Sequence, residues 1–140
     1  MFINEIGIDM LLDGKQLVES LRSQVNEVDC VTLNQCLQQN KQLLFIDIRE
    51  PNETSAGSPM GSELIPRGVL EMQLTDLAVY QSLISTLSSV SQLPIYLICR
   101  SGARSILAAA SLQQMGYQNV YSVAGGFLAW QAQGLLVQSE

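Results

Sequence analysis

The eleven residues at 95–105, IYLICRSGARS, decide the fold, because they place a cysteine between an apolar run and a helical segment. Residues 95–99 form a short run of β-branched, aromatic and other apolar side chains, which predicts a buried strand of a parallel sheet. Gly102 opens a segment of strong helix formers, and Gly116 is the expected C-cap of that helix. A buried strand that leads directly into a helix predicts an α/β domain.

The same alternation of strands and helices extends in both directions from this stretch. The other predicted strands are 28–31, 43–48, 62–65 and 120–123. The other predicted helices are 12–25, a helix after Thr32 as N-cap, 74–87 and 127–133. Residues 49–61 hold two Pro and two Gly and predict a loop. Parallel strands joined in this way are expected to have right-handed crossovers.

Composition and charge favour one independently folded domain. The 140 residues are 47% apolar and 14% charged, which indicates a sizeable core and argues against disorder. The net charge of −6 with seven Lys and Arg argues against nucleic-acid binding. The N-terminus lacks a basic signal-peptide region, and no apolar run reaches the ~18 residues of a membrane span. We therefore expect a cytoplasmic protein with reduced thiols.

The cysteine and histidine content limits the available chemistry. There is no histidine, so the chain has no Cys–His pair and no Ser–His–Asp triad. The three cysteines, Cys30, Cys36 and Cys99, are not spaced as a disulfide framework or as C-x-x-C, so we expect no metal site. Any nucleophile must be activated by something other than imidazole.

Cys99 is the candidate nucleophile. Small residues at 101–103 allow the backbone to curl so that several N–H groups point inward, at the positive end of the following helix. Such a site favours the thiolate, and Arg100 and Arg104 add positive potential. A lone cysteine at the end of a core strand is commonly just a buried structural residue. The surrounding sequence CRSGAR favours the functional interpretation.

Four blocks in this order resemble the rhodanese homology domain over nearly the whole chain. They are IDIRE at 46–50, IPRGVLE at 65–71, CRSGARS at 99–105 and VAGGF at 123–127 with Trp130. The resemblance implies a five-stranded open parallel sheet flanked by helices on both faces, and a cysteine that cycles through a persulfide. The helix at 12–25 is additional. We therefore expect an N-terminal extension at 1–27 and the rhodanese domain at 28–140.

The resemblance also implies roles for the residues of each block. Cys99 is the catalytic residue. The substrate-binding loop consists of Arg100, Ser101, Gly102, Ala103 and Arg104. The supporting residues are Asp47, Arg49 and Arg67. We expect Asp47 to order the loop, for instance by pairing with Arg104, although a carboxylate at a strand end is often only a cap. Arg49 and Arg67 are either substrate contacts or salt-bridged surface residues.

Several other residues are expected to be structural. Val123, Phe127 and Trp130 are predicted to belong to the core, and Cys30 and Cys36 are predicted to be buried without a redox role. One block departs from the family pattern: the usual Gly-His-Ile-Pro-Gly is replaced by GSPMG at 57–61, with Ser58 at the histidine position. This change affects a loop near the mouth of the site and leaves the substrate open.

The expected activity is thiosulfate sulfurtransfer through a Cys99 persulfide to cyanide or a thiol, with no metal and no organic cofactor. The partners are then a small anionic sulfur donor and a thiophilic acceptor. A carrier that delivers sulfur to a protein partner and a non-catalytic binding module remain alternatives. A phosphatase is less favoured, because related phosphatases place five residues between Cys and Arg, whereas four separate Cys99 from Arg104.

Overall fold

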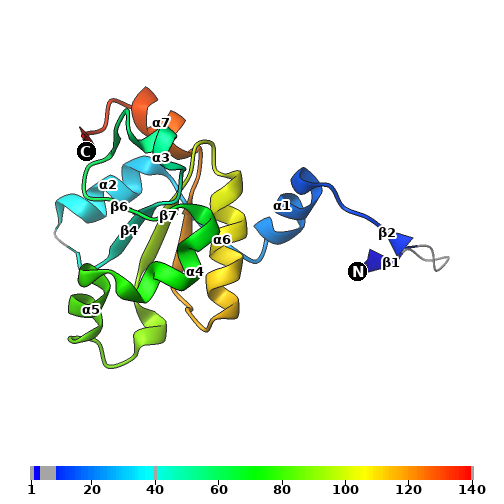
Figure 1. The fold of residues 1–140 in the computed structure, drawn as a ribbon, viewed down its shortest axis with the longest axis horizontal. Coiled ribbons are helices and arrows are strands. Elements are labelled where there is room, and N and C mark those ends of the chain that lie inside the picture. The colour runs from blue at the N-terminus through cyan, green and yellow to red at the C-terminus, as the bar shows by residue number, and fades with distance from the viewer. Residues whose placement is uncertain (1, 4–8, 40, 140) are drawn as a thin grey trace.

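The computed structural model describes residues 2–3, 9–39 and 41–139 (Figure 1). Its centre is a five-stranded sheet in the order β3-β8-β7-β4-β6, in which all neighbouring strands are parallel. The five strands are β3 (Asn26–Val28), β4 (Leu44–Asp47), β6 (Glu63–Leu64), β7 (Ile95–Ile98) and β8 (Val120–Val123). The predicted open parallel sheet is confirmed.

Helices cover both faces of this sheet, as predicted. The helices are α1 (Gly14–Arg22), α2 (Cys30–Gln38), α3 (Pro51–Thr54), α4 (Leu70–Gln73), α5 (Ala78–Ile84), α6 (Ala103–Gln114) and α7 (Gly126–Ala132). Short 3-10 turns are η1 (Arg67–Val69), η2 (Leu74–Asp76) and η3 (Val90–Gln92). No helix in the described part of the chain is both long and apolar enough to cross a bilayer.

Two short antiparallel pairs lie outside the main sheet. Near the N-terminus β1 (Phe2–Ile3) pairs with β2 (Asp9–Met10). At the other end of the chain β9 (Val137–Gln138) pairs with β5 (Ser58–Pro59). The second pair ties the C-terminal segment to the loop that carries Ser58. The C-terminal segment therefore helps to fix the loop that carries Ser58.

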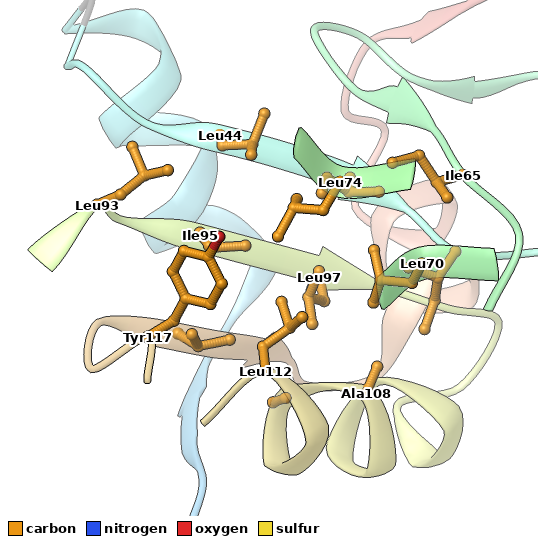
Figure 2. Packing of buried hydrophobic residues seen from close by; sticks show 14 of the residues in the cluster. Leu44, Ile65, Leu70, Leu74, Leu93, Ile95, Leu97, Ala108, Leu112 and Tyr117 are labelled. Carbon is orange, nitrogen blue, oxygen red and sulfur yellow. The ribbon is translucent and has the colours of Figure 1, made fainter. Parts of the chain in front are cut away.

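The core is divided between the two faces of the sheet. On one face, buried side chains of β4 and β7 pack against α4, α5 and α6, and Figure 2 shows Leu97 of β7 directed toward Leu112 of α6. On the other face, α2 and α7 cover a smaller cluster that contains Phe45 and Trp130. Each fully buried large side chain contributes about 1.5–3 kcal/mol relative to exposure. Both cores hold the central strands rigidly, and the loops after those strands are fixed with them.

The N-terminal helix is present but shorter than predicted. It begins after Asp13, whose carboxylate accepts a hydrogen bond from the Gln16 N–H at 2.8 Å, while the Gln16 side chain accepts from the Asp13 N–H at 2.9 Å. This capping box explains the start at Gly14 rather than at residue 12. Val18 is the buried side chain of the helix, and α1 lies against α6 (Figure 1).

The start of α2 was predicted wrongly. Its N-cap is Asp29, not Thr32: the Asp29 carboxylate accepts a hydrogen bond from the Thr32 N–H at 2.7 Å. A carboxylate three residues earlier caps the same helix one turn sooner. The preceding strand accordingly ends at Val28 instead of residue 31.

Two further segments differ from the prediction. Residues 49–61 contain the short helix α3 and the strand β5 in addition to loop. Pro51 stands at the first position of α3, where a missing N–H costs nothing. The helix predicted at 74–87 is divided, because Leu77 adopts an extended conformation (ψ 131°) between η2 and α5. Apolar spacing continues across this break, so periodicity alone does not reveal it.

Candidate active site

Cys99 lies at the carboxyl end of the central strand β7, where the chain turns into α6. Its side chain is buried, with 1% of its surface exposed. Gly102 is the N-cap of α6 and has φ +104°, and a Cβ there would lie 3.3 Å from the Gly125 backbone nitrogen. A side chain at this position would be strained and crowded, so the glycine allows the tight turn around the sulfur.

The Cys99 sulfur is surrounded by hydrogen-bond donors from its own loop. The Gly102 N–H points at Sγ from 3.1 Å and the Ser105 N–H from 3.4 Å. The Ser105 Oγ lies 3.3 Å from the same sulfur. These groups belong to the N-cap and first turn of a twelve-residue helix, where the helix dipole also favours negative charge. Two backbone N–H groups at a helix N-terminus therefore face the sulfur, an arrangement that favours negative charge at this position.

The back of the loop is held by α7. The Phe127 N–H donates to the Cys99 carbonyl at 2.8 Å, and the Leu128 N–H donates to the Arg100 carbonyl at 3.1 Å. Gly126 makes this approach possible: a Cβ there would lie 2.6 Å from the Cys99 carbonyl oxygen and 2.5 Å from that of Arg100. Because α7 binds the loop carbonyls, the loop N–H groups remain directed toward the sulfur.

Arg104 pairs with Glu53, and the predicted pairing of Arg104 with Asp47 is wrong. Arg104 Nη1 and Nη2 each lie 2.9 Å from one oxygen of the Glu53 carboxylate. The hydrogen bonds from Arg104 lower the pKa of Glu53 from its ordinary value of 4.5 to about 2. Glu53 belongs to α3, in a segment predicted to be loop, so spacing along the chain does not point to it as the partner.

Asp47 instead forms a buried ion pair with Arg49. Arg49 Nη2 lies 2.8 Å from Asp47 Oδ2, and Nε lies 3.1 Å from both carboxylate oxygens. The Arg49 Nη2 also donates to the Gly57 carbonyl at 2.8 Å. Its guanidinium carbon lies 3.9 Å from the centre of the Phe127 ring. Arg49 is therefore fixed in orientation by a carboxylate, a carbonyl and an aromatic face.

A cavity of about 330 Å³ opens beside the Cys99 loop. Its lining residues are Arg49, Glu53, Ala56, Arg100, Phe127, Leu128 and Gln131. Arg100 adds positive charge to this wall, the charge of Arg49 is balanced by Asp47, and that of Glu53 is balanced by Arg104. A larger cleft of about 600 Å³ lies between α1 and α6 with Arg104 at its edge, and its walls are mainly apolar. Cys99 itself lines neither space, and the smaller cavity is the one that Arg100, the residue after Cys99, lines together with Arg49.

The remaining residues predicted for the site are not all brought together. Arg67 does not line the cavity; its Nη1 lies 3.0 Å from Glu71 Oε2 in an ion pair. Ser101 and Ala103 are exposed positions of the loop. Ser58 is buried, and its hydroxyl accepts a hydrogen bond from the Gln138 side chain at 3.2 Å. Ser58, which stands where the family has histidine, thus contacts the C-terminal segment.

The residues predicted to be structural are mostly confirmed. Val123 and Trp130 are fully buried, and Cys30 is buried with a raised thiol pKa because of its burial. Cys36 is only partly buried, so the prediction of its burial is wrong. Phe127 is buried but also lines the cavity beneath Arg49, a contact that core periodicity does not reveal.

Comparison with known proteins identifies relatives of this chain. A family model described as "Rhodanese-like domain" matches residues 32–133. A protein named "Sulfurtransferase" from Allochromatium vinosum is 33% identical over 111 residues, which cover 79% of this chain and 92% of that protein. "Thiosulfate sulfurtransferase GlpE" from Pseudoalteromonas translucida is 32% identical over 90 residues, covering 64% of this chain and 74% of that protein.

A solved structure from Rhodopseudomonas palustris has the same fold over most of the chain. It is described as a protein of unknown function and a possible tyrosine phosphatase. The TM-score is 0.75 at 25% identity, and the match covers 94% of this chain and 100% of that one. The names of these three proteins thus describe two sulfurtransferases and one possible tyrosine phosphatase.

Proposed function

Because this chain belongs to the rhodanese-like domain family, we propose that it transfers sulfane sulfur through a persulfide on Cys99. The observation that carries this proposal is the position of the Cys99 sulfur, which faces the N–H groups of Gly102 and Ser105 at the start of α6. Backbone donors held in this way stabilise negative charge on sulfur without any need for histidine. Relatives that are named sulfurtransferases support sulfur transfer in general.

Thiosulfate is the proposed donor. The Cys99 thiolate attacks the outer sulfur of thiosulfate, a new S–S bond forms, and the S–S bond within thiosulfate breaks. Sulfite leaves with the electron pair of that bond, and the Cys99 persulfide keeps one negative charge. Arg100 at the wall of the cavity is positioned to attract the doubly charged donor, whereas the charge of Arg49 is balanced by Asp47.

The second half of the reaction regenerates the thiolate. Cyanide attacks the terminal sulfur of the persulfide, the S–S bond to Cys99 breaks, and thiocyanate leaves. A thiolate acceptor reacts in the same way and becomes a persulfide itself. In both half-reactions the sulfane sulfur passes from one nucleophile to another without any external oxidant or reductant, so the ping-pong cycle balances without a redox cofactor.

A protein acceptor is the second candidate for this half-reaction. The cavity beside the Cys99 loop is lined in part by Leu128, whose side chain is 46% exposed. An exposed apolar rim next to a cationic wall suits a protein segment that carries a cysteine. Kinetics with cyanide alone do not separate this candidate from the first, because both share the Cys99 persulfide.

A phosphatase is less well supported. Hydrolysis of a phosphate ester needs a general acid to protonate the leaving group. Glu53 is the carboxyl group that lines the cavity and is therefore the candidate general acid. The hydrogen bonds from Arg104, however, lower its pKa to about 2. It is therefore ionised at neutral pH and unsuited to donate a proton. The four-residue spacing between Cys99 and Arg104 also favours sulfur over a phosphoryl group.

The test is the mass of the intact protein after treatment with thiosulfate. We expect the mass to rise by one sulfur atom, with release of sulfite, and cyanide to reverse the change. Cys99→Ser is expected to abolish the gain, whereas Cys36→Ser, which changes the partly exposed cysteine, is the matched control and is expected to retain it. A persulfide located on Cys30 or Cys36 contradicts the assignment, and complete absence of sulfur loading favours the non-catalytic binding module.

A further inference from the structure

Two buried hydroxyl groups lie beneath the Cys99 sulfur. The Ser105 Oγ and the Ser122 Oγ are 2.7 Å apart, and both residues have no exposed surface. Ser105 belongs to the first turn of α6, and Ser122 belongs to β8, the strand next to β7 in the sheet. A hydroxyl among the buried apolar residues of a central strand is costly unless it is hydrogen-bonded, so the presence of Ser122 requires an explanation.

The two hydroxyls form a chain that ends at the sulfur. Ser105 Oγ lies 3.3 Å from Cys99 Sγ and 3.3 Å from the Gly102 carbonyl oxygen. Within the described residues, Ser105 is the one hydrogen-bond partner found for the Ser122 side chain. Ser105 has a single proton and three neighbours that can take it, whereas the Ser122 proton has one clear acceptor, the Ser105 oxygen.

We infer that Ser122 is a positioning residue, which directs the Ser105 proton toward the Cys99 sulfur when that sulfur is anionic. This inference rests on the proposed function for its role in turnover. When Ser122 donates to Ser105, the Ser105 proton is released toward the thiolate or persulfide, and the donated hydrogen bond strengthens Ser105 as a donor. In the thiol form the order reverses: the Cys99 S–H donates to Ser105 Oγ, and Ser105 donates onward.

A purely structural role for Ser122 makes a different prediction. If Ser122 only fills space between β8 and α6, alanine at this position serves nearly as well, because it lacks only the oxygen. If Ser122 acts through Ser105, its loss weakens the anionic form of Cys99, and the effect disappears once Ser105 has already been removed. The two roles are therefore separated by a double-mutant cycle.

The experiment measures the rate of Cys99 alkylation by iodoacetamide against pH, in a Cys36→Ser background so that the partly exposed Cys36 does not react. We expect Ser122→Ala to slow alkylation at neutral pH about threefold to tenfold, the range for loss of one hydrogen bond. Ser105→Ala is expected to slow it at least as much. The double variant Ser105→Ala/Ser122→Ala is expected to match Ser105→Ala alone.

Two variants serve as controls. Ser122→Thr keeps the hydroxyl and is expected to retain the pH profile of the unsubstituted protein. Ser62→Ala removes a buried hydroxyl that donates to the Pro59 carbonyl at 2.8 Å, away from Cys99, and is expected to leave the profile unchanged. Thermal unfolding of each variant shows that it is folded, and sulfur loading from thiosulfate is measured in parallel.

The outcomes separate this inference from the proposed function. An unchanged profile in Ser122→Ala, or effects of the two alanine substitutions that simply multiply in the double variant, overturns the role of Ser122. If the unsubstituted protein takes up no sulfur, the proposed function fails. In that case the alkylation profiles still decide whether Ser122 controls the Cys99 thiolate through Ser105.

Discussion

The Arg104 guanidinium and the Glu53 carboxylate form a two-armed ion pair, each arm 2.9 Å long, that joins the Cys99 loop to α3. The pair connects residues 51 positions apart. It fixes the C-terminal end of the loop from outside the sheet, whereas α7 fixes its beginning from behind. The orientation of the loop N–H groups therefore depends on two separate anchors.

The ion pair predicts a loss of stability in acid. The pKa of Glu53 is about 2 in the folded protein, below its ordinary value of 4.5, chiefly because of the Arg104 hydrogen bonds. A lowered carboxyl pKa stabilises the fold above pH ~4.5, and that contribution is lost as the pH falls toward 2. Because both side chains are partly exposed, we expect it to amount to only about 1 kcal/mol.

The measurement is urea unfolding at intervals between pH 6 and pH 2. Glu53→Gln and Arg104→Gln are each expected to remove the same part of the pH dependence, since either change breaks the pair. The double variant is expected to lose no more than either single variant. Independent, additive losses in the two single variants contradict the pairing.

Arg100 is predicted to act in donor binding. It lines the cavity beside the Cys99 loop, whereas the guanidinium of Arg67 is bound to Glu71 and does not line it. We expect Arg100→Ala to raise the KM for thiosulfate about tenfold with kcat little changed, because it removes uniform attraction for the anion. Arg67→Ala is the matched control and is expected to leave KM within about twofold. If both substitutions raise KM equally, the effect comes from the net charge of the protein and not from a contact between Arg100 and the donor.

The Asp47–Arg49 pair is predicted to be critical for stability. Asp47 is fully buried and Arg49 is 5% exposed, so Asp47→Asn leaves a buried guanidinium without its counter-ion. We expect this substitution to lower the free energy of unfolding by about 3 kcal/mol. Glu27→Gln breaks the exposed pair with Arg22 and is expected to cost less than about 1 kcal/mol. Similar losses from the two substitutions, measured by urea unfolding, disprove this distinction.

Gly126 is predicted to tolerate no side chain. A Cβ would lie 2.6 Å from the Cys99 carbonyl oxygen, and the neighbouring atoms are backbone that cannot move freely. We expect Gly126→Ala to reduce sulfur loading of Cys99 by more than about tenfold, because α7 has to shift away from the loop. Gly116→Ala is the control: Gly116 also has positive φ, but open space surrounds it, so we expect reduced stability with sulfur loading retained.

The fold is readable from sequence because local patterns and the sheet agree. The apolar runs at 43–48 and 95–99 contain the strands β4 and β7, and the helix that follows Gly102 begins where its glycine predicts. The ends of helices were less predictable, because a single side-chain hydrogen bond decides where a helix begins. Asp29 and Thr32 are both good caps, and their spacing alone does not show which one is used.

The site was predictable only where its groups are consecutive. The loop around Cys99 supplies its own donors, so its chemistry follows from CRSGAR alone. Glu53 and Ser122 come from segments that the fold brings to the loop, and neither has a periodic or compositional signal. Asp47 and Arg49 are two residues apart, and their direct pairing excluded the expected contact between Asp47 and Arg104.

The hydrogen bonds from α7 to the loop carbonyls allow amide hydrogen exchange to measure how firmly the Cys99 loop is held. The amide protons of Phe127 and Leu128 are held by the carbonyls of Cys99 and Arg100. They can exchange with solvent deuterium only when α7 separates from the loop, and that same opening frees the donors that face the sulfur. The exchange rates of these two amides therefore report how often the Cys99 loop separates from α7.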